Sequence, residues 1–220
     1  MKRLIHKIKI LIPMLVFFVL YMFAFSVLEK YQALNYHYMF ADIDRMIPFC
    51  EVFVVPYFMW FLFIPAVVVY LLFAEENEYR YTSMMLIIGM SAFIIISAVF
   101  PTKLQLRPVV MPRENIFSDM VKMLYSIDTS TNVFPSIHVY NTVVVLWAIF
   151  KSRTRLFGKT FVRVCAACLS ALIVLATMFL KQHSVIDVAG AFLLFGVVRT
   201  AVVAFYRQRR LIPSFGERRS

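Results

Sequence analysis

The stretch VFVVPYFMWFLFIPAVVVYLLFA, residues 52–74, decides the fold class of this chain. None of its side chains carries a formal charge, and the charged sequence EENEYR follows directly. As a helix rising about 1.5 Å per residue, the stretch would be about 35 Å long, which exceeds the roughly 30 Å of hydrocarbon in a bilayer. It therefore predicts a transmembrane helix and an all-α membrane protein.

The rest of the chain repeats this pattern. Of its 220 residues, 62% are hydrophobic and only 16% are charged, against about 45–50% and about 25% in soluble domains. Five further apolar segments are predicted to span the membrane, at 10–28, 83–100, 134–150, 161–180 and 184–206. We expect one polytopic membrane domain over 10–206, a six-transmembrane helix bundle between a basic leader, 1–9, and a basic tail, 207–220. The leader has no small-residue cleavage pattern after it, so we expect an uncleaved anchor.

The basic residues predict the orientation of this bundle. The formal net charge is +11, which in a soluble protein would suggest nucleic acid binding. Here 15 of the 23 Lys and Arg fall in or beside the termini and the connections 75–82 and 151–160. The positive-inside rule places these parts in the cytoplasm. The expected partners are thus the bilayer of the cell membrane and its anionic headgroups, not nucleic acid.

The longest connection, 101–133, falls on the outer side and contains an amphipathic segment. Ile116, Phe117 and Val121 lie on one face of a helix there, with Ser118 and Asp119 on the other. Such a helix either lies in the membrane interface or packs as a cover on the bundle, and the pattern fits both. The Cys165 and Cys168 pair lies in an apolar segment and is interpreted as packing, so no metal and no cofactor are expected.

The stretch KQHSVID, 181–187, brings a histidine and a carboxylate together. His183 and Asp187 are four residues apart, which places their side chains on one face of a helix. A carboxylate on one ring nitrogen fixes the tautomer and favours positive charge on the imidazole, as a nucleophilic or basic histidine requires. The alternative is a capping box, with Ser184 as N-cap and Asp187 three residues on.

The stretch FPSIH, 134–138, holds a second histidine at the start of an apolar run. Pro135 suits the first helical position, so the free N–H groups of that turn and the Ser136 hydroxyl could bind an anion, with His138 just inside. The alternative is a helix that Ser136 caps and whose His138 faces water.

Two cations precede these stretches in the outer connection, because Lys103 and Arg107 stand four apart in KLQLRP. Taken alone, these two residues are explained as the charges that commonly flank a membrane span. Together with two histidines on the same side of the membrane, they describe a phosphate site: cations and N–H groups for the oxygens, one histidine to attack and one to protonate the leaving group.

The three stretches, in this order, resemble the type-2 phosphatidic acid phosphatase superfamily. Its pattern is Lys-x6-Arg-Pro, then Pro-Ser-Gly-His, then Ser-Arg-x5-His-x3-Asp, on a six-helix membrane bundle. Arg107-Pro108, Pro135-Ser136-Ile137-His138 and His183-x3-Asp187 match it. The sequence departs from this pattern at three places. Lys103 stands four residues before Arg107 and not seven, Ile137 replaces Gly, and Ala176-Thr177 replaces Ser-Arg. The relaxed motif looks more like the branch of inositol phosphorylceramide synthases and their bacterial relatives.

The resemblance implies a metal-independent lipid phosphate phosphatase with its site on the outer face. His183, oriented by Asp187, would attack phosphorus, and His138 would protonate the leaving alkoxide. Lys103, Arg107 and Ser136 would hold the phosphate oxygens, with Lys181, Lys103 or Arg113 replacing the charge missing at Thr177. Two alternatives stay open: a lipid phosphotransferase that uses an alcohol as acceptor, and a transporter or proton relay with no enzymatic activity.

Overall fold

The computed structural model describes residues 2–30 and 35–208, so most of the expected tail 207–220 lies outside the described residues. Nearly all regular structure in the described part is helical. The long helices are α1 (Lys2–Lys30), α3 (Val54–Ala74), α4 (Glu76–Val99), α6 (Ile137–Lys151), α7 (Thr160–Phe179) and α8 (Val185–Gln208). The short elements are β1 (His37–Tyr38), α2 (Ile43–Met46), the 3-10 turn η1 (Glu51–Phe53), β2 (Thr102–Lys103) and α5 (Ile116–Ile127). The prediction of an all-α fold is confirmed.

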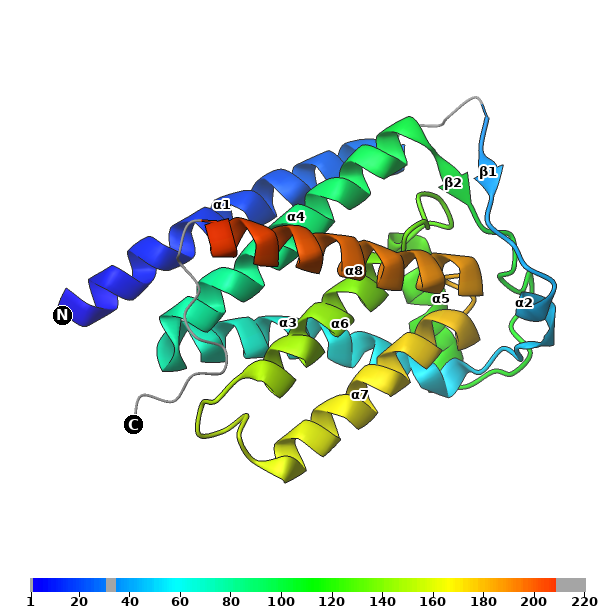
Figure 1. Ribbon diagram of the computed structural model, residues 1–220. Helices are drawn as coiled ribbons and strands as arrows, with labels where there is room; N and C mark the ends of the chain where they lie inside the picture. Colours follow the sequence, from blue (N-terminus) through cyan, green and yellow to red (C-terminus); the bar gives the residue numbers. More distant parts are fainter. Residues whose placement is uncertain (1, 31–34, 209–220) are drawn as a thin grey trace.

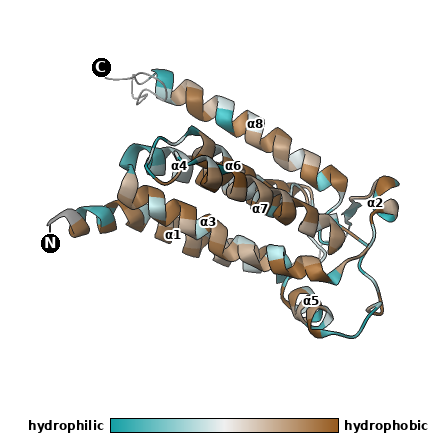
Figure 2. Ribbon diagram, turned by 90° about the horizontal axis from the view of Figure 1, so that it is seen from below, coloured by the Kyte–Doolittle hydropathy of each residue, from teal (hydrophilic) through white to brown (hydrophobic). Residues whose placement is uncertain are grey.

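The long helices run side by side, and the short elements gather at one end of them (Figure 1). The start of α1 and the end of α8 lie at the opposite end. Hydrophobic residues, brown in Figure 2, predominate along the long helices, and large side chains such as Val19 and Phe23 on α1 are 67% and 72% exposed. An apolar outer surface of this extent is what helices in contact with lipid present. The chain is therefore described as an integral membrane protein.

Within residues 2–30 and 35–208, five helical segments are long and apolar enough to cross a bilayer: Leu4–Lys30, Glu51–Ala74, Glu76–Val99, Thr160–Phe179 and Val185–Gln208. The remaining segment expected to span, 134–150, differs from the prediction. Its helix α6 has 15 residues, or about 22 Å at 1.5 Å per residue. The chain before it forms a turn, so Pro135 is not at the first helical position: Ser136 is the N-cap, and the helix begins at Ile137.

The short helix α6 lies at the centre of the bundle, in contact with α3, α4, α7 and α8. Its Tyr140 is fully buried and donates a hydrogen bond to the Met85 carbonyl on α4 (2.7 Å). Gly89 lets the two helices approach, because a Cβ there would lie 2.0 Å from the Cζ of Tyr140. The close approach fixes where the first turn of α6, with His138, sits in the bundle.

The helix boundaries also correct the expected connections. The segment 75–82 was predicted to link two spans, but only Glu75 separates α3 from α4. Charged residues there continue the helix, since Arg80 pairs with Glu76 one turn away (2.9 Å), and such i, i+4 pairs stabilise helices. Likewise α1 begins within the expected leader, 1–9.

The amphipathic segment in 101–133 forms α5, capped by Asn115, whose side chain accepts a hydrogen bond from the Ser118 amide (3.0 Å). Val121 and Leu124 are buried in one cluster with Tyr57 of α3 and Leu180 after α7. Of the two predicted placements, the structure therefore has the cover packed on the bundle.

Candidate active site

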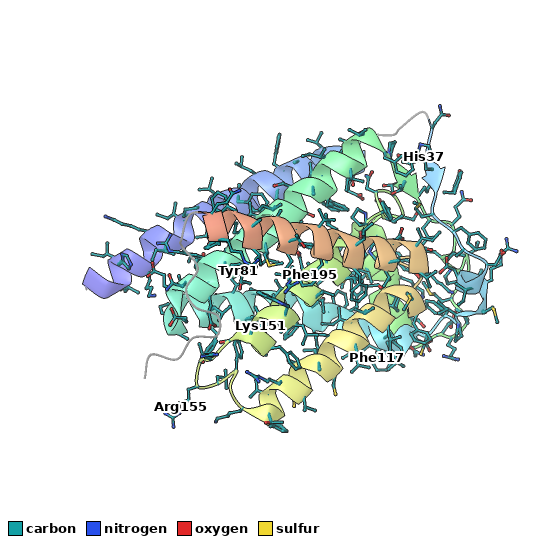
Figure 3. The ribbon with its side chains drawn as sticks, viewed as in Figure 1. His37, Tyr81, Phe117, Lys151, Arg155 and Phe195 are labelled. Carbon is teal, nitrogen blue, oxygen red and sulfur yellow. The ribbon has the colours of Figure 1, made fainter. Side chains whose placement is uncertain are left out.

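Both predicted histidines line one cavity at the end of the bundle where the short elements gather. Figure 3 labels His37 at this end, with Lys151 and Arg155 toward the other. The cavity has a volume of about 30 Å³, enough for a water molecule. Its polar wall includes His138, His183, Asp128 and Gln182, and its apolar wall includes Phe25 and Phe93.

The two imidazoles come from separate segments and lie close together in the wall of this cavity. The ring of His138, in the first turn of α6, lies 5.8 Å from the ring of His183, between α7 and α8, measured between centroids. His138 is packed against the rings of Tyr57 and Trp60, at 4.8 and 4.5 Å. Its backbone carbonyl accepts hydrogen bonds from the Trp60 indole (3.1 Å) and the Thr142 hydroxyl (2.7 Å). Backbone and ring are thus both held in place.

Asp187 serves both of the roles that the sequence left open. Its Oδ2 lies 3.5 Å from Nδ1 of His183, an ion-pair distance that is longer than a hydrogen bond. The same oxygen accepts a hydrogen bond from the Ser184 amide (2.8 Å), and the Ser184 hydroxyl accepts one from the Ile186 amide (3.1 Å). The predicted cap is therefore present, although the Ser184 hydroxyl binds the Ile186 amide and not the Asp187 amide, and it brings the fully buried carboxylate to the imidazole. The predicted shared helix face is wrong in detail, because α8 begins at Val185 and His183 precedes it.

Asp44, on α2, is part of this helix start although nothing in the sequence marked it. Its buried carboxylate accepts hydrogen bonds from the Ser184 hydroxyl (2.6 Å), the Val185 amide (2.9 Å) and the Ala41 amide (2.8 Å). A carboxylate at a helix N-terminus pairs with free N–H groups and with the positive end of the helix dipole. It therefore anchors the loop before α3 to the segment that carries His183.

Lys181 points away from the cavity. Its φ of 53° is in the left-handed region, and its ammonium donates hydrogen bonds to the backbone carbonyls of Asp44 (2.8 Å) and Ile47 (2.5 Å). Burial lowers the pKa of the Lys181 ammonium, and the nearby Asp44 carboxylate opposes this effect. The predicted role in phosphate binding is thus not supported by its position, because its donors bind the backbone of the loop before α3.

Arg107 lies next to the cavity, on residues that line it. Its Nη2 donates hydrogen bonds to the carbonyls of Asp128 and Thr129, each at 2.8 Å, and to the side chain of Gln182. The guanidinium lies 4.3 Å above the Tyr125 ring. Burial lowers the pKa of Arg107, and the charge of Asp128 opposes this effect; burial also raises the pKa of Tyr125 to about 12. Arg107 is therefore the predicted cation whose hydrogen-bond partners Asp128, Thr129 and Gln182 line the cavity.

The other predicted phosphate-binding residues lie elsewhere. Lys103 is on β2 and holds its ammonium 5.5 Å from the centre of the Tyr36 ring. Ser136 is fully buried, and its hydroxyl accepts a hydrogen bond from the Val139 amide (3.4 Å), as a helix cap does. Neither residue is among those lining the cavity in the described part of the chain. The capping alternative is thus the arrangement seen for Ser136.

At position 177, where the family pattern has a cation, this chain has Thr177. The Thr177 hydroxyl donates to the Val174 carbonyl of its own helix (2.7 Å). Arg113, a predicted substitute, forms two hydrogen bonds with the buried Glu51 (2.8 and 2.9 Å), and this pairing raises the pKa of Arg113. Within residues 2–30 and 35–208, no group of three or more His, Cys, Asp or Glu is arranged to hold a metal ion.

Two residues near the histidines were not predicted: Asp128, which lines the cavity, and Tyr57, which contacts both Asp128 and His138. Asp128 follows α5, and its Oδ2 accepts hydrogen bonds from the Tyr57 hydroxyl (2.8 Å) and, at 3.4 Å, from the Gln182 amide. The Tyr57 hydroxyl also lies 3.1 Å from Nε2 of His138. The sequence offered only one weak signal for each: Asp128 is an acidic residue in the connection 101–133, and Tyr57 is a tyrosine inside an apolar span.

Comparison of the chain with protein-family models, with curated proteins and with solved structures gives no match.

Proposed function

We propose that this protein is an integral membrane lipid phosphate phosphatase that forms a phosphohistidine on His183. One observation carries the proposal: the rings of His183 and His138, from separate segments, line one cavity with their centroids 5.8 Å apart. One histidine has a buried carboxylate behind it, and the other has a hydroxyl at its ring nitrogen. Two imidazoles placed to act on one phosphorus can divide attack and proton transfer between them.

In the first step, Nε2 of His183 attacks the phosphorus, because Nδ1 faces Asp187. The phosphorus–nitrogen bond forms as the bond to the lipid oxygen breaks, and the leaving alkoxide takes a proton from the His138 imidazolium. The Asp187 carboxylate stabilises the positive charge that develops on His183. The products are a lipid alcohol and the phosphohistidine.

In the second step, His138, now neutral, takes a proton from water. The resulting oxygen attacks the phosphorus, the phosphorus–nitrogen bond breaks, and phosphate leaves with both histidines restored. The charge that offsets the phosphate oxygens comes from Arg107, whose contacts with Asp128, Thr129 and Gln182 place it beside the cavity. Orientation of the reactants and these fixed charges supply the catalysis.

The two walls of the cavity support a lipid as substrate. A phosphate group would meet the histidines, while the attached chain would lie against Phe25 and Phe93. The volume of about 30 Å³ is smaller than a phosphate group, so substrate binding requires these walls to separate. Phe25 is on α1, the helix with the most exposed apolar surface, and its displacement opens the cavity toward lipid.

The same proposal includes six spans, with α6 as the shortest, both termini in the cytoplasm and the site at the outer face. The start of α1 and the end of α8 lie together at one end of the bundle (Figure 1), as an even number of spans requires. The connection 151–160 and the N-terminal leader supply most of the basic charge at that end, in agreement with the positive-inside rule.

The proposal is tested with the purified full-length protein and a panel of radiolabelled lipid phosphates, without added metal. We expect phosphate release from at least one lipid and an acid-labile label on the protein, both abolished in His183→Ala. His37→Ala is the matched control, because His37 lies at the same end and stacks on Phe100 at 4.0 Å, outside the cavity. Turnover at the wild-type rate in His183→Ala would reject the assigned nucleophile.

A phosphotransferase would share the first step and differ only in the acceptor. The relaxed motif favours this second candidate, since it resembles the branch that transfers headgroups between lipids. The panel is therefore run with and without a lipid alcohol. Label that moves to the alcohol without release of free phosphate would identify a transferase, whereas free phosphate in both arms identifies a phosphatase.

A further inference from the structure

The ring of His138 is connected by hydrogen bonds to a carboxylate that it does not touch. The Tyr57 hydroxyl donates to Oδ2 of Asp128 at 2.8 Å and lies 3.1 Å from Nε2 of His138. Tyr57 is 1% exposed, and its ring also packs on the imidazole. Three residues from α3, the loop after α5 and α6 thus form one chain of polar contacts at the cavity.

The proton count along this chain fixes the state of His138. A tyrosine hydroxyl has one proton, and that proton is donated to Asp128. Its oxygen can then only accept from the imidazole, so Nε2 of His138 carries a hydrogen. The other nitrogen, Nδ1, is buried and has no hydrogen-bond partner among the described residues. In the neutral ring Nδ1 therefore holds the free lone pair.

We infer that Tyr57 and Asp128 are positioning residues for His138: they hold its Nε2–H and leave Nδ1 as the nitrogen that exchanges protons with the substrate. The inference rests on the proposed function for its chemistry. When His138 is protonated, the charge of Asp128, relayed by the Tyr57 hydroxyl, stabilises the imidazolium. In both steps only the Nδ1 proton is transferred, and the Nε2 proton stays on its bond to Tyr57.

The carboxylate at the far end of the chain is itself held in place. Arg107 donates to the backbone carbonyl of Asp128 and to the side chain of Gln182, whose amide lies 3.4 Å from the Asp128 carboxylate. Arg107 and Asp128 are 21 residues apart in the chain, so these contacts fix the path of the loop after α5. The guanidinium therefore keeps the carboxylate within reach of Tyr57.

The tautomer can be observed directly, whether or not the protein is an enzyme. The chain has 4 histidines, so ¹⁵N-histidine labelling of the full-length protein in nanodiscs gives few ring signals, and the signal lost in His138→Gln assigns His138. We expect wild-type His138 to be protonated at Nε2 with a pyridine-like Nδ1. Tyr57→Phe should abolish this preference. Wild-type protonation at Nδ1, or the same spectrum in Tyr57→Phe, would overturn the inference.

Tyr140→Phe is the matched control for Tyr57→Phe. Both tyrosines are buried and donate one hydrogen bond, but the Tyr140 hydroxyl bonds to the Met85 carbonyl, away from the cavity. We expect the His138 signal and the turnover of Tyr140→Phe to match wild type. If Tyr140→Phe changes the His138 tautomer as much as Tyr57→Phe does, the effect is a general loss of packing and the inference fails.

Activity provides the second measurement. Asp128→Asn keeps an oxygen acceptor for Tyr57 and removes the charge, so the fold is preserved. We expect both formation and hydrolysis of the phosphohistidine to slow by about 10- to 100-fold, a part of the 10²–10⁴ that general acid–base catalysis supplies. An active wild type with an equally active Asp128→Asn variant would refute the inference. No turnover in wild type, with the expected tautomer, would refute the proposed function alone.

Discussion

Gly190→Ala should separate the two histidine segments by adding a single methyl group. Gly190 lies on α8, one turn after Asp187, and a Cβ there would be 2.3 Å from Cε2 and 2.8 Å from Cζ of Phe134. Phe134 precedes the turn that ends at Ser136, whose amide donates to the Asp187 carbonyl (3.1 Å). Displacement of the ring therefore pushes the start of α6, with His138, away from α8.

The size of the effect follows from two opposing terms. Carbon atoms in contact are about 3.5–4.0 Å apart, so the ring must move by roughly 1.2 Å or more. Overpacking of this kind costs about 1–3 kcal/mol, whereas Ala favours a helix over Gly by about 1 kcal/mol. Gly196→Ala, on the same helix, should gain the helix propensity of Ala without the overpacking cost, because nothing lies within 4 Å of a Cβ at position 196. The difference between the two variants isolates the clash, about 1–3 kcal/mol.

The assay is thermal unfolding of both variants in the same detergent, followed by circular dichroism, with phosphate release measured alongside. At about 2–4 °C per kcal/mol for a chain of this size, Gly190→Ala should unfold several degrees below Gly196→Ala. It should also release phosphate more slowly. Equal unfolding temperatures for the two variants would refute the role given to the contact between Gly190 and Phe134.

Three further predictions concern the outer end of the bundle. Asp44→Ala removes the acceptor of two buried donors at the start of α8, so it should lower the free energy of unfolding by about 2–4 kcal/mol; exposed Asp42→Ala, which removes no such bond, should not. Arg107→Lys should lower kcat/KM about tenfold, because one ammonium cannot replace a guanidinium that binds three acceptors; an unchanged value would count against its role. In a cysteine-free background, an impermeant thiol reagent should label Glu114→Cys and not Arg153→Cys, and the reverse pattern would invert the proposed topology.

Most of the fold could be predicted because hydrophobic length alone identifies membrane helices. The errors fall at helix ends, because the length of an apolar segment does not show at which residue its helix begins or ends. The charged residues after 74 were interpreted as a connection, yet they extend α4, since Glu76 and Arg80 pair along the helix. The helix expected to begin at Pro135 begins at Ile137, after a cap at Ser136, because a Pro-Ser pair in the sequence suits either start.

The candidate site was predictable where its residues are close in sequence. His183 and Asp187 were identified by their spacing, and His138 by its place at the start of an apolar run. The direction in which a side chain points was not predictable. Lys181 is two residues from His183 in the sequence, but its left-handed backbone turns the ammonium toward the carbonyl of Asp44. Asp44 and Asp128 were missed because their partners are far away in the chain, across loops whose path no local pattern specifies.

The capping box and the catalytic pair at 183–187 were treated as competing interpretations, but the structure makes one the condition for the other. The Ser184 amide holds Oδ2 of Asp187 (2.8 Å), and that oxygen faces Nδ1 of His183. The positive end of the α8 dipole favours the ionised carboxylate, which in turn favours positive charge on the imidazole. Because Asp44 holds the Ser184 hydroxyl at the same helix start, the position of the proposed nucleophile, His183, depends on a loop about 140 residues earlier. A short sequence motif can therefore identify this pair, while the contacts that hold it in place come from the tertiary fold.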